Sequence, residues 1–214
     1  MYDKCYEYEN CISVEGIVTE GLTRSHEAFG RVFYKGTIDV PRLSGYVDMI
    51  PFICQDSMLS EAALKSVFRN AAVRLEGEIR TYKMPNIEYP RLMVAMYVRS
   101  FQMIGRDNLE QSAKNSVILS GAICQNPIFR HTALGRDVCE LKIAVARAVG
   151  QKSDYIPCIA WAGNAKEAAA FTVGTYVRAT GRFQSRPYTK DKGDGKSEQR
   201  CAYEVSLFRL SRDS

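Results

Sequence analysis

Residues 26–31 read HEAFGR and residues 131–136 read HTALGR, so the pattern H-x-A-x-G-R occurs twice, 105 residues apart. The histidines of these two stretches are the only histidines in the chain. A pattern that returns at a fixed spacing indicates an internal repeat, and a repeat constrains every later assignment of the fold.

The match between the two halves continues well beyond this motif. The corresponding residues are Ile38, Val40 and Arg42 with Ile143, Val145 and Arg147; Asp48 and Pro51 with Asp154 and Pro157; and Val73, Leu75 and Gly77 with Val177, Ala179 and Gly181. Their spacing is 105, 106 and 104 residues in the three blocks, and such small shifts are expected where loops separate the matching elements of two copies. We therefore predict a tandem duplication, with one domain at 1–104, a polar linker at 105–114 and a second domain at 115–214.

Composition fits an ordinary globular protein of this length. Hydrophobic residues make up 46% and charged residues 25% of the 214 positions, which leaves room for two domains with cores of their own. The sequence contains no apolar run of bilayer length and no signal-peptide pattern at its start, so we expect a cytoplasmic protein without a membrane span. The seven cysteines form no C-x-x-C pair, which favours reduced thiols over disulfides or a metal site.

The positive charge is concentrated in one half of the chain. Residues 1–106 carry 13 Lys and Arg against 13 Asp and Glu, whereas residues 107–214 carry 16 against 11. Because phosphate neutralisation is the main sequence-independent source of affinity for nucleic acid, a polyanionic partner is expected on the second half. A basic surface without such a partner is the alternative.

Hydrophobic periodicity predicts the same element order, β-β-β-α-β-β, in both halves. Strands are expected at 11–19, 31–40, 46–54, 72–82 and 91–101 in the first copy, and at 115–125, 137–147, 154–161, 175–186 and 201–210 in the second. Short helices are expected at 59–71 and 163–171. Gly16 and Gly121 lie inside the first strand of each copy, where a barrel must bend. This order predicts an all-β fold with one short helix per domain, namely two tandem OB-fold Greek-key barrels.

No catalytic or cofactor-binding constellation stands out. The sequence contains no H-E-x-x-H, no G-x-S-x-G and no glycine-rich phosphate loop. Each histidine is expected to serve its own loop, with a shared metal site as the weaker alternative. We therefore expect a protein that is not an enzyme and that needs neither a metal nor another cofactor.

Residues suited to nucleic-acid binding lie in the second copy. Tyr155 and Trp161 fall on one face of the predicted strand at 154–161, where such rings could stack on bases. Further aromatic and cationic residues lie in and after the next strand. These are Arg182, Phe183, Arg186 and Tyr188, followed by Lys190 and Lys192 in a predicted mobile loop at 187–198. For Trp161 and Phe183, core packing is the alternative.

The second half resembles the bacterial single-stranded DNA-binding protein family. The resemblance rests on NSVILSG at 115–121, the run from Asn126 to Gly135, IAVAR at 143–147, DYIPCIAW at 154–161 and VGTYVRATGR at 173–182. It implies base stacking by Tyr155, Trp161 and Tyr188. It also places Arg130, Arg147, Arg182 and Arg186 in segments that contact phosphates or bases.

The first half resembles that family only through the repeat. Its counterparts of the three stacking aromatics are Met49, Gln55 and Met84, so any stacking there would need relocated rings such as Tyr34, Tyr82 and Tyr89. Family members with two barrels per chain form homodimers, so the resemblance implies a homodimer with four barrels. The chain stops at LFRLSRDS without the acidic tail with which family members recruit replication and repair proteins, so recruitment by a tail is not expected.

The expected function is non-catalytic, largely sequence-independent binding of single-stranded DNA, in replication, recombination or repair. RNA stays open as the strand that is bound, because stacking does not distinguish a 2′-hydroxyl. The alternative is a primosome-like adaptor or oligomerisation protein whose barrels mainly contact proteins.

Overall fold

The computed structural model describes residues 10–59, 70–83, 92–107, 109, 114–148, 151–193 and 196–213. The first half contains β1 (Asn10–Val18), β2 (Thr23–Ala28), β3 (Arg31–Pro41), β4 (Val47–Gln55), a 3-10 turn (Asp56–Met58), β5 (Ala71–Lys83) and β6 (Leu92–Met103). The second half contains β7 (Asn115–Ile123), β8 (Ile128–His131), β9 (Asp137–Ala146), β10 (Ser153–Trp161), α3 (Gly163–Ala169), β11 (Tyr176–Asp191) and β12 (Ser197–Arg212). The predicted all-β class with two OB-fold barrels is confirmed.

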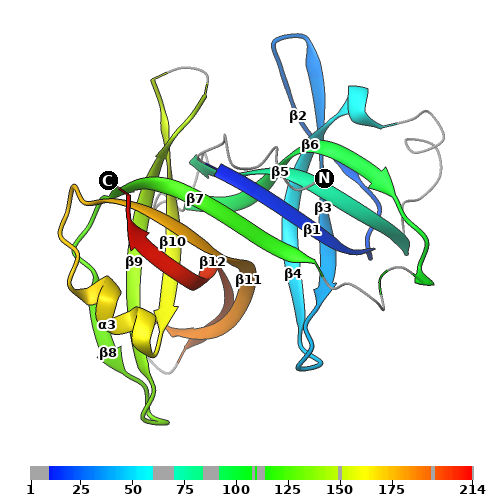
Figure 1. Ribbon diagram of the computed structural model, residues 1–214. Coiled ribbons are helices and arrows are strands. Elements are labelled where there is room, and N and C mark those ends of the chain that lie inside the picture. The colour runs from blue at the N-terminus through cyan, green and yellow to red at the C-terminus, as the bar shows by residue number, and fades with distance from the viewer. Residues whose placement is uncertain are drawn as a thin grey trace.

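Both halves close in the same way. The strand order is β2-β3-β4-β6-β5-β1-β7-β11-β12-β10-β9-β8, and the additional pairings β1–β3 and β7–β9 close one barrel each (Figure 1). The predicted helix at 163–171 is confirmed as α3, which follows β10. Its counterpart at 59–71 lies almost entirely outside the described residues.

The two barrels meet along their first strands. β1 pairs with β7 antiparallel, and Ile12 lies opposite Val117, its own counterpart in the repeat. A pairing centred on equivalent residues relates the two copies by a local two-fold axis, so a contact on one side of the axis is expected again on the other. Figure 1 shows the two strands running side by side between the barrels.

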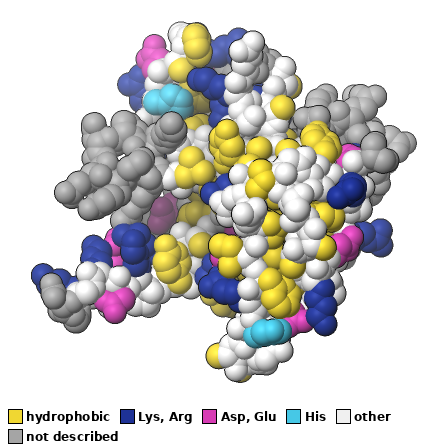
Figure 2. Space-filling view, turned by 90° about the vertical axis from the view of Figure 1, so that its left-hand side faces the viewer, with side chains coloured by type: hydrophobic (Ala, Val, Ile, Leu, Met, Phe, Trp, Pro, Cys, Tyr) yellow, Lys and Arg dark blue, Asp and Glu magenta, His cyan; other side chains and the backbone are white. Residues whose placement is uncertain are grey.

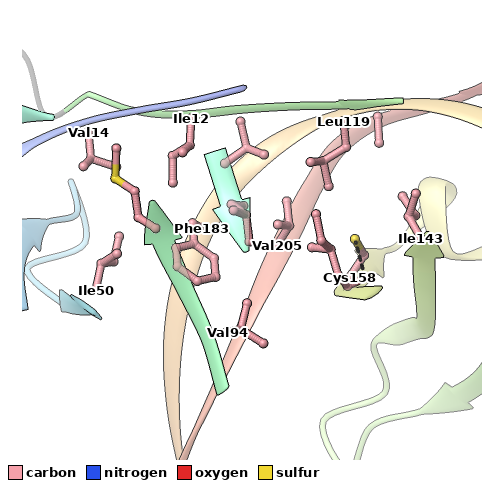
Figure 3. Close-up of a cluster of buried hydrophobic side chains, with 14 of the residues drawn as sticks. Ile12, Val14, Ile50, Val94, Leu119, Ile143, Cys158, Phe183 and Val205 are labelled. Atoms are coloured by element: carbon pink, nitrogen blue, oxygen red, sulfur yellow. Dashed lines mark hydrogen bonds between the residues drawn. The ribbon is translucent and has the colours of Figure 1, made fainter. Parts of the chain in front are cut away.

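One hydrophobic core runs beneath this pair of strands. Ile12 and Val14 from β1 and Leu119 from β7 are fully buried and belong to the same cluster as Ile143 and Val205. Figure 3 shows these side chains on the inner side of the two strands. The pairing of β1 with β7 therefore buries apolar surface of both barrels as well as linking their backbones.

The repeated H-x-A-x-G-R motif forms a β-hairpin turn in each barrel, and the short strands β2 and β8 were missed by the predicted order. In the first barrel the turn consists of Phe29 and Gly30, both with positive φ (53° and 69°), between the paired residues Ala28 and Arg31. In the second barrel it runs from Thr132 to Arg136, with Gly135 at φ 71°. The glycine supplies the left-handed residue that each turn requires. β2 (TRSHEA) is polar and β8 (IFRH) is only four residues long, so neither gave an alternation from which a strand could be predicted.

Two equivalent polar junctions tie the barrels together. At the Thr81 junction, Asp154 binds Arg147 (Oδ1 to Nη2, 2.7 Å) and accepts the N–H of Thr81 (2.7 Å). At the Ser185 junction, Asp48 binds Arg42 (Oδ2 to Nε, 2.7 Å) and accepts the N–H of Ser185 (2.9 Å). Each aspartate comes from one barrel, and the N–H that it accepts comes from the other.

Most described cysteines fit the expectation of reduced thiols. Cys54, Cys124, Cys139, Cys158 and Cys201 are free, and burial raises the pKa of the Cys54 thiol to about 12. Cys11 is disulfide-bonded, so the expectation of reduced thiols throughout is wrong at this position.

The bend of β1 gives a first test of the fold. A Cβ at Gly16 would overlap the carbonyl oxygen of Asp39, whereas a Cβ at Gly21 would meet nothing. Gly16→Ala should lower the free energy of unfolding by about 1 to 3 kcal/mol, because β1 and β3 cannot then approach as closely. Denaturant titration measures this difference, and Gly21→Ala is the control that should stay near wild type. Equal stability of the two variants would contradict the tight crossing at Gly16.

The Thr81 junction gives a second test. The side chain of Asp154 is 1% exposed and that of Arg147 is 23% exposed. Asp154→Ala should cost about 3 kcal/mol of unfolding free energy, because it removes the carboxylate that neutralises Arg147 and leaves the N–H of Thr81 without its acceptor. The control is Glu27→Ala, which breaks the exposed Arg24–Glu27 pair and should cost less than about 1 kcal/mol. A loss for Asp154→Ala as small as that of the control would show that the junction does not hold the barrels together.

Candidate nucleic-acid interface

Strand β10 presents two aromatic rings on the outer face of the second barrel. Ile156, Cys158 and Ala160 point into the core, whereas Tyr155, Pro157, Ile159 and Trp161 point the other way, as the period of two predicts. Tyr155 is 47% exposed and Trp161 is half-buried, but Ile159 between them is buried. The two rings therefore lie at either end of a strand face whose middle is covered, and they do not form one continuous exposed stripe.

Residues 187–191 of β11 and 197–198 of β12 are paired, which corrects the predicted mobile loop over this part of 187–198. β11 and β12 continue as a two-stranded arm, with Tyr188 opposite Arg200 and Lys190 opposite Glu198. Pairing persists because oppositely charged and aromatic side chains face each other across the strands, which stabilises a hairpin despite its low hydrophobicity. Figure 2 shows basic side chains along the arm that projects at the lower left. The tip residues 194 and 195 lie outside the described part of the chain.

The arm holds its charges in fixed pairs near its tip. Glu198 binds Arg200 (2.7 Å) and Lys192 (2.9 Å), and these two partners lower the pKa of Glu198 to about 2. Lys190 is exposed and forms no ion pair with any residue that the structure describes. Lys190 is therefore the arm's more available cation, and Lys192 already has a carboxylate.

Tyr188 and Arg186 lie together where the arm leaves the barrel. Tyr188 is 37% exposed, and the guanidinium carbon of Arg186 lies 6.0 Å from the centre of its ring. Glu204 accepts from Arg186 Nε (2.9 Å) and from Gln184 (3.0 Å), and its hydrogen bond to Arg186 is the main cause of the raised pKa of that guanidinium. Arg186 nevertheless stays 45% exposed, so it is oriented by Glu204 and still open to an anion.

Arg130 repeats this arrangement on β8. It forms an ion pair with Glu140 of β9, and its side chain is 55% exposed. Glu140 lies near enough to Arg186 to contribute to the raised pKa of that guanidinium, so the two arginines lie on the same side of the barrel. In the sheet, β12 and β10 lie between β11 and β9, so this outer face continues across five strands. We call it the second-barrel face and define it by Arg130, Tyr155, Trp161, Arg186 and Tyr188.

Three of the predicted contact residues do not lie open on this face. Phe183 is fully buried, its ring lies 6.4 Å from that of Tyr203, and Figure 3 shows it inside the core. Arg147 is part of the Thr81 junction. Arg182 is half-buried, and its pKa is lowered by burial and by the neighbouring charge of Arg42. Phe183 and Arg147 are therefore structural residues, because their side chains already have partners inside the protein.

The motif that revealed the repeat also lines a hollow beside Trp161. Gly135, Arg136 and Asp137 from the β8–β9 turn border it together with Trp161 and Ala162, and its volume is about 510 Å³. Asp137 contacts His131 (2.7 Å) and Lys166 of α3 (3.5 Å), so Lys166 and Arg136 both lie at this end of the barrel. Arg136 was not among the predicted contact residues, although its place in the repeated motif could have pointed to it.

The first barrel lacks open rings at the equivalent positions. Met49 is 49% exposed and Gln55 is buried, and Met84 lies outside the described residues. Of the relocated rings that were expected, Tyr34 packs against the core, burial raises the pKa of Tyr82 and Tyr89 lies outside the described residues. The two copies therefore share a scaffold but not an outer surface.

The part of the chain that the structure describes contains no cluster of three or more His, Cys, Asp or Glu side chains that could hold a metal ion. Within the same residues, no helix is long and apolar enough to cross a membrane.

Comparison with solved structures supports the two-barrel architecture over nearly the whole chain. The wild-type single-stranded DNA binding protein from Thermus aquaticus superposes with a TM-score of 0.72 at 16% sequence identity, covering 96% of this chain and 93% of that chain. At this level of identity the likeness establishes a shared fold.

Sequence comparison places the second half among known proteins. The model of the single-strand binding protein family matches residues 114–210. Single-stranded DNA-binding protein B of Bacillus subtilis is 32% identical over 85 residues, which cover 37% of this chain and 75% of that protein. Single-stranded DNA-binding protein 1 of Lactococcus lactis is 34% identical over 85 residues, covering 37% of this chain and 57% of that protein. These matches coincide with the barrel that carries the exposed rings and arginines, and they show that the chain belongs to the single-strand binding protein family.

Proposed function

We propose that the protein binds single-stranded DNA on the second-barrel face, without catalysis and with little dependence on base sequence. The observation that carries this proposal is the joint exposure of Tyr155 and Tyr188 beside Arg186. Aromatic faces accept any base, and neighbouring cations neutralise the phosphates that connect the bases. Among its relatives, the proteins from Bacillus subtilis and Lactococcus lactis are named for the same activity.

Each residue of the face has a separate task in this mechanism. Tyr155 and Tyr188 stack on bases, and the half-buried Trp161 contacts a base with its open edge. Arg186 and Arg130, oriented by Glu204 and Glu140, bind phosphates as guanidinium groups whose direction is set beforehand. Lys190 on the arm adds an exposed charge. Arg182, half-buried near Arg42, adds positive potential more than direct contact.

We further propose the domain boundaries and the oligomeric state in which this face binds DNA. The two barrels correspond to residues 1–104 and 115–214 with a linker at 105–114, and two chains assemble as a homodimer of four barrels. The setting is the cytoplasm, at DNA exposed during replication, recombination or repair. Light-scattering mass determination tests the dimer directly. The adaptor alternative has no observation of its own in favour, since the exposed rings and cations suit nucleic acid.

The stacking role of the two tyrosines can be tested against a matched tyrosine. Trp161 is the only tryptophan, so its fluorescence reports on this face, and poly(dT) should quench it. Tyr155→Ala and Tyr188→Ala should each weaken binding by about 1 to 3 kcal/mol, the usual contribution of one base–aromatic stack. Tyr176→Ala is the control, because Tyr176 is 40% exposed on the same barrel but outside the face. Unquenched fluorescence together with no gel shift at low salt would refute the proposal, and poly(rU) in the same assay decides between DNA and RNA.

The charges of the arm can be tested through salt dependence. For single strands, log K falls with log[salt] by about 0.7 for each phosphate that the protein neutralises. Lys190→Ala should therefore reduce the slope by about 0.7, whereas Lys192→Ala should reduce it less, because Lys192 is already paired with Glu198. Binding isotherms at four or more salt concentrations give both slopes. A larger change for Lys192→Ala than for Lys190→Ala would mean that the arm's ion pair opens on binding.

A further inference from the structure

A second cluster of rings lies on the outer side of the first barrel. The ring of His26 on β2 stacks on that of Phe33 on β3, with centroids 4.7 Å apart and planes inclined by 7°. The ring of Tyr97 on β6 lies 6.3 Å from that of Phe33. His26 is exposed and Tyr97 is half-buried, while Phe33 beneath His26 is 9% exposed. The stacked pair therefore turns the free side of the imidazole to solvent.

Cationic groups flank these rings. The guanidinium carbon of Arg99 lies 4.7 Å, and that of Arg80 5.7 Å, from the centre of the Tyr97 ring. Arg99 donates to Glu78 (3.0 Å) and its side chain remains 50% exposed. This repeats the arrangement of the second-barrel face, where a glutamate orients an arginine that stays open to solvent. We call the set His26, Phe33, Tyr97 and Arg99 the first-barrel cluster.

The first-barrel cluster does not occupy the positions that carry the exposed rings of the second barrel. The counterparts of Tyr155 and Trp161 are Met49 and Gln55 on β4, whereas the cluster is built on β2, β3 and β6. Arg31 donates to the buried Gln55 (3.2 Å), which lies opposite Phe33 in the β3–β4 ladder. The positions equivalent to Tyr155 and Trp161 therefore carry no exposed ring in the first barrel. The rings and cations that suit nucleic acid lie on other strands of that barrel.

Contacts across the Thr81 junction connect the two surfaces. Arg80, which lies over Tyr97, also places Nη1 3.6 Å from Oδ2 of Asp154 in the second barrel. The neighbouring Thr81 accepts the N–H of Tyr155 at 3.3 Å. The chain of contacts from Tyr97 through Arg80 and Asp154 thus ends at the tyrosine that we place in contact with DNA.

We propose that the first-barrel cluster is a second contact surface for single-stranded DNA, reached by the same strand after it passes Tyr155. The inference rests on the proposed function and defines how far the DNA-binding surface extends, since the bound strand would cross both barrels of one chain. Stacked rings with a free face, next to exposed cations, suit unpaired bases and their phosphates without reading sequence. His26 is the outermost stacking ring, and Arg99 is the phosphate contact.

Removing the rings of the cluster tests whether the DNA-binding surface includes the first barrel, and it leaves the second barrel unchanged. The double variant His26→Ser/Phe33→Leu removes both stacked rings and keeps apolar volume at Phe33, and Tyr97→Leu is a second, independent variant. Each is titrated by Trp161 fluorescence with a short oligo(dT) that one barrel can cover and with poly(dT). A barrel of this fold covers roughly 4 to 16 nucleotides. We expect unchanged affinity for the short strand, about fivefold to a hundredfold weaker binding of poly(dT), and fewer nucleotides bound per chain at saturation.

Leu43→Ala is the matched control, because Leu43 is a fully exposed apolar residue of the same barrel outside the cluster, and it should behave as wild type. Wild-type affinity and stoichiometry for poly(dT) in both ring variants, with thermal transitions that show them to be folded, would overturn the inference. That outcome differs from failure of the proposed function, in which the wild-type protein itself would neither quench nor shift. An equal loss for short and long strands would also overturn it, since it would place the effect on the second barrel.

Discussion

The antiparallel pairing of β1 with β7 is the contact on which the remaining architecture depends. Because Ile12 lies opposite its own counterpart Val117, the pairing sets a local two-fold relation between the barrels. That relation brings β5 of the first barrel to the β9–β10 hairpin and β11 of the second to the β3–β4 hairpin. A buried aspartate, Asp154 or Asp48, then accepts an N–H from the opposite barrel at each site. The junctions therefore follow from the strand pairing and do not require a separate interface.

This arrangement explains which residues the two copies share. Arg42 and Asp48 match Arg147 and Asp154 because each pair satisfies buried polar groups at a junction, where loss of either partner leaves an uncompensated charge. No such constraint acts on the outer faces, and there the copies differ most. The second barrel exposes Tyr155 where the first exposes Met49, although both residues follow the junction aspartate directly. Similarity between the halves therefore marks the shared scaffold, and difference marks the surfaces.

Sequence reasoning recovered the scaffold and only part of the face. The period of two and the repeat located ten strands and α3, because burial on one side of a strand leaves a pattern in the chain. Arg147 and Arg186 each pair with a buried carboxylate, but Arg147 is 23% exposed and Arg186 is 45% exposed. The same pattern could not predict this difference, so the two arginines looked alike. It also placed Phe183 on the binding face, although that ring points into the core, and it assigned the arm to a loop because cross-strand charge pairs have no hydrophobic signature. The stacking of His26 on Phe33 was not predicted, because β2 is polar and the contact depends on the register of a hairpin.

The distribution of charge orders the two surfaces in the proposed binding event. The first half of the chain has no net charge and the second half carries the whole excess of five, so a polyanion is drawn to the second barrel at long range. The arm with Lys190 projects from that barrel and extends its reach. In the first-barrel cluster, Arg99 is paired with Glu78, which largely cancels its charge at a distance. The cluster therefore attracts phosphates only at short range. A DNA strand bound at Tyr188 and Tyr155 is then held beside Arg80. Binding of the same strand to the first barrel is therefore an intramolecular step, and the loss of translational freedom on association has already occurred.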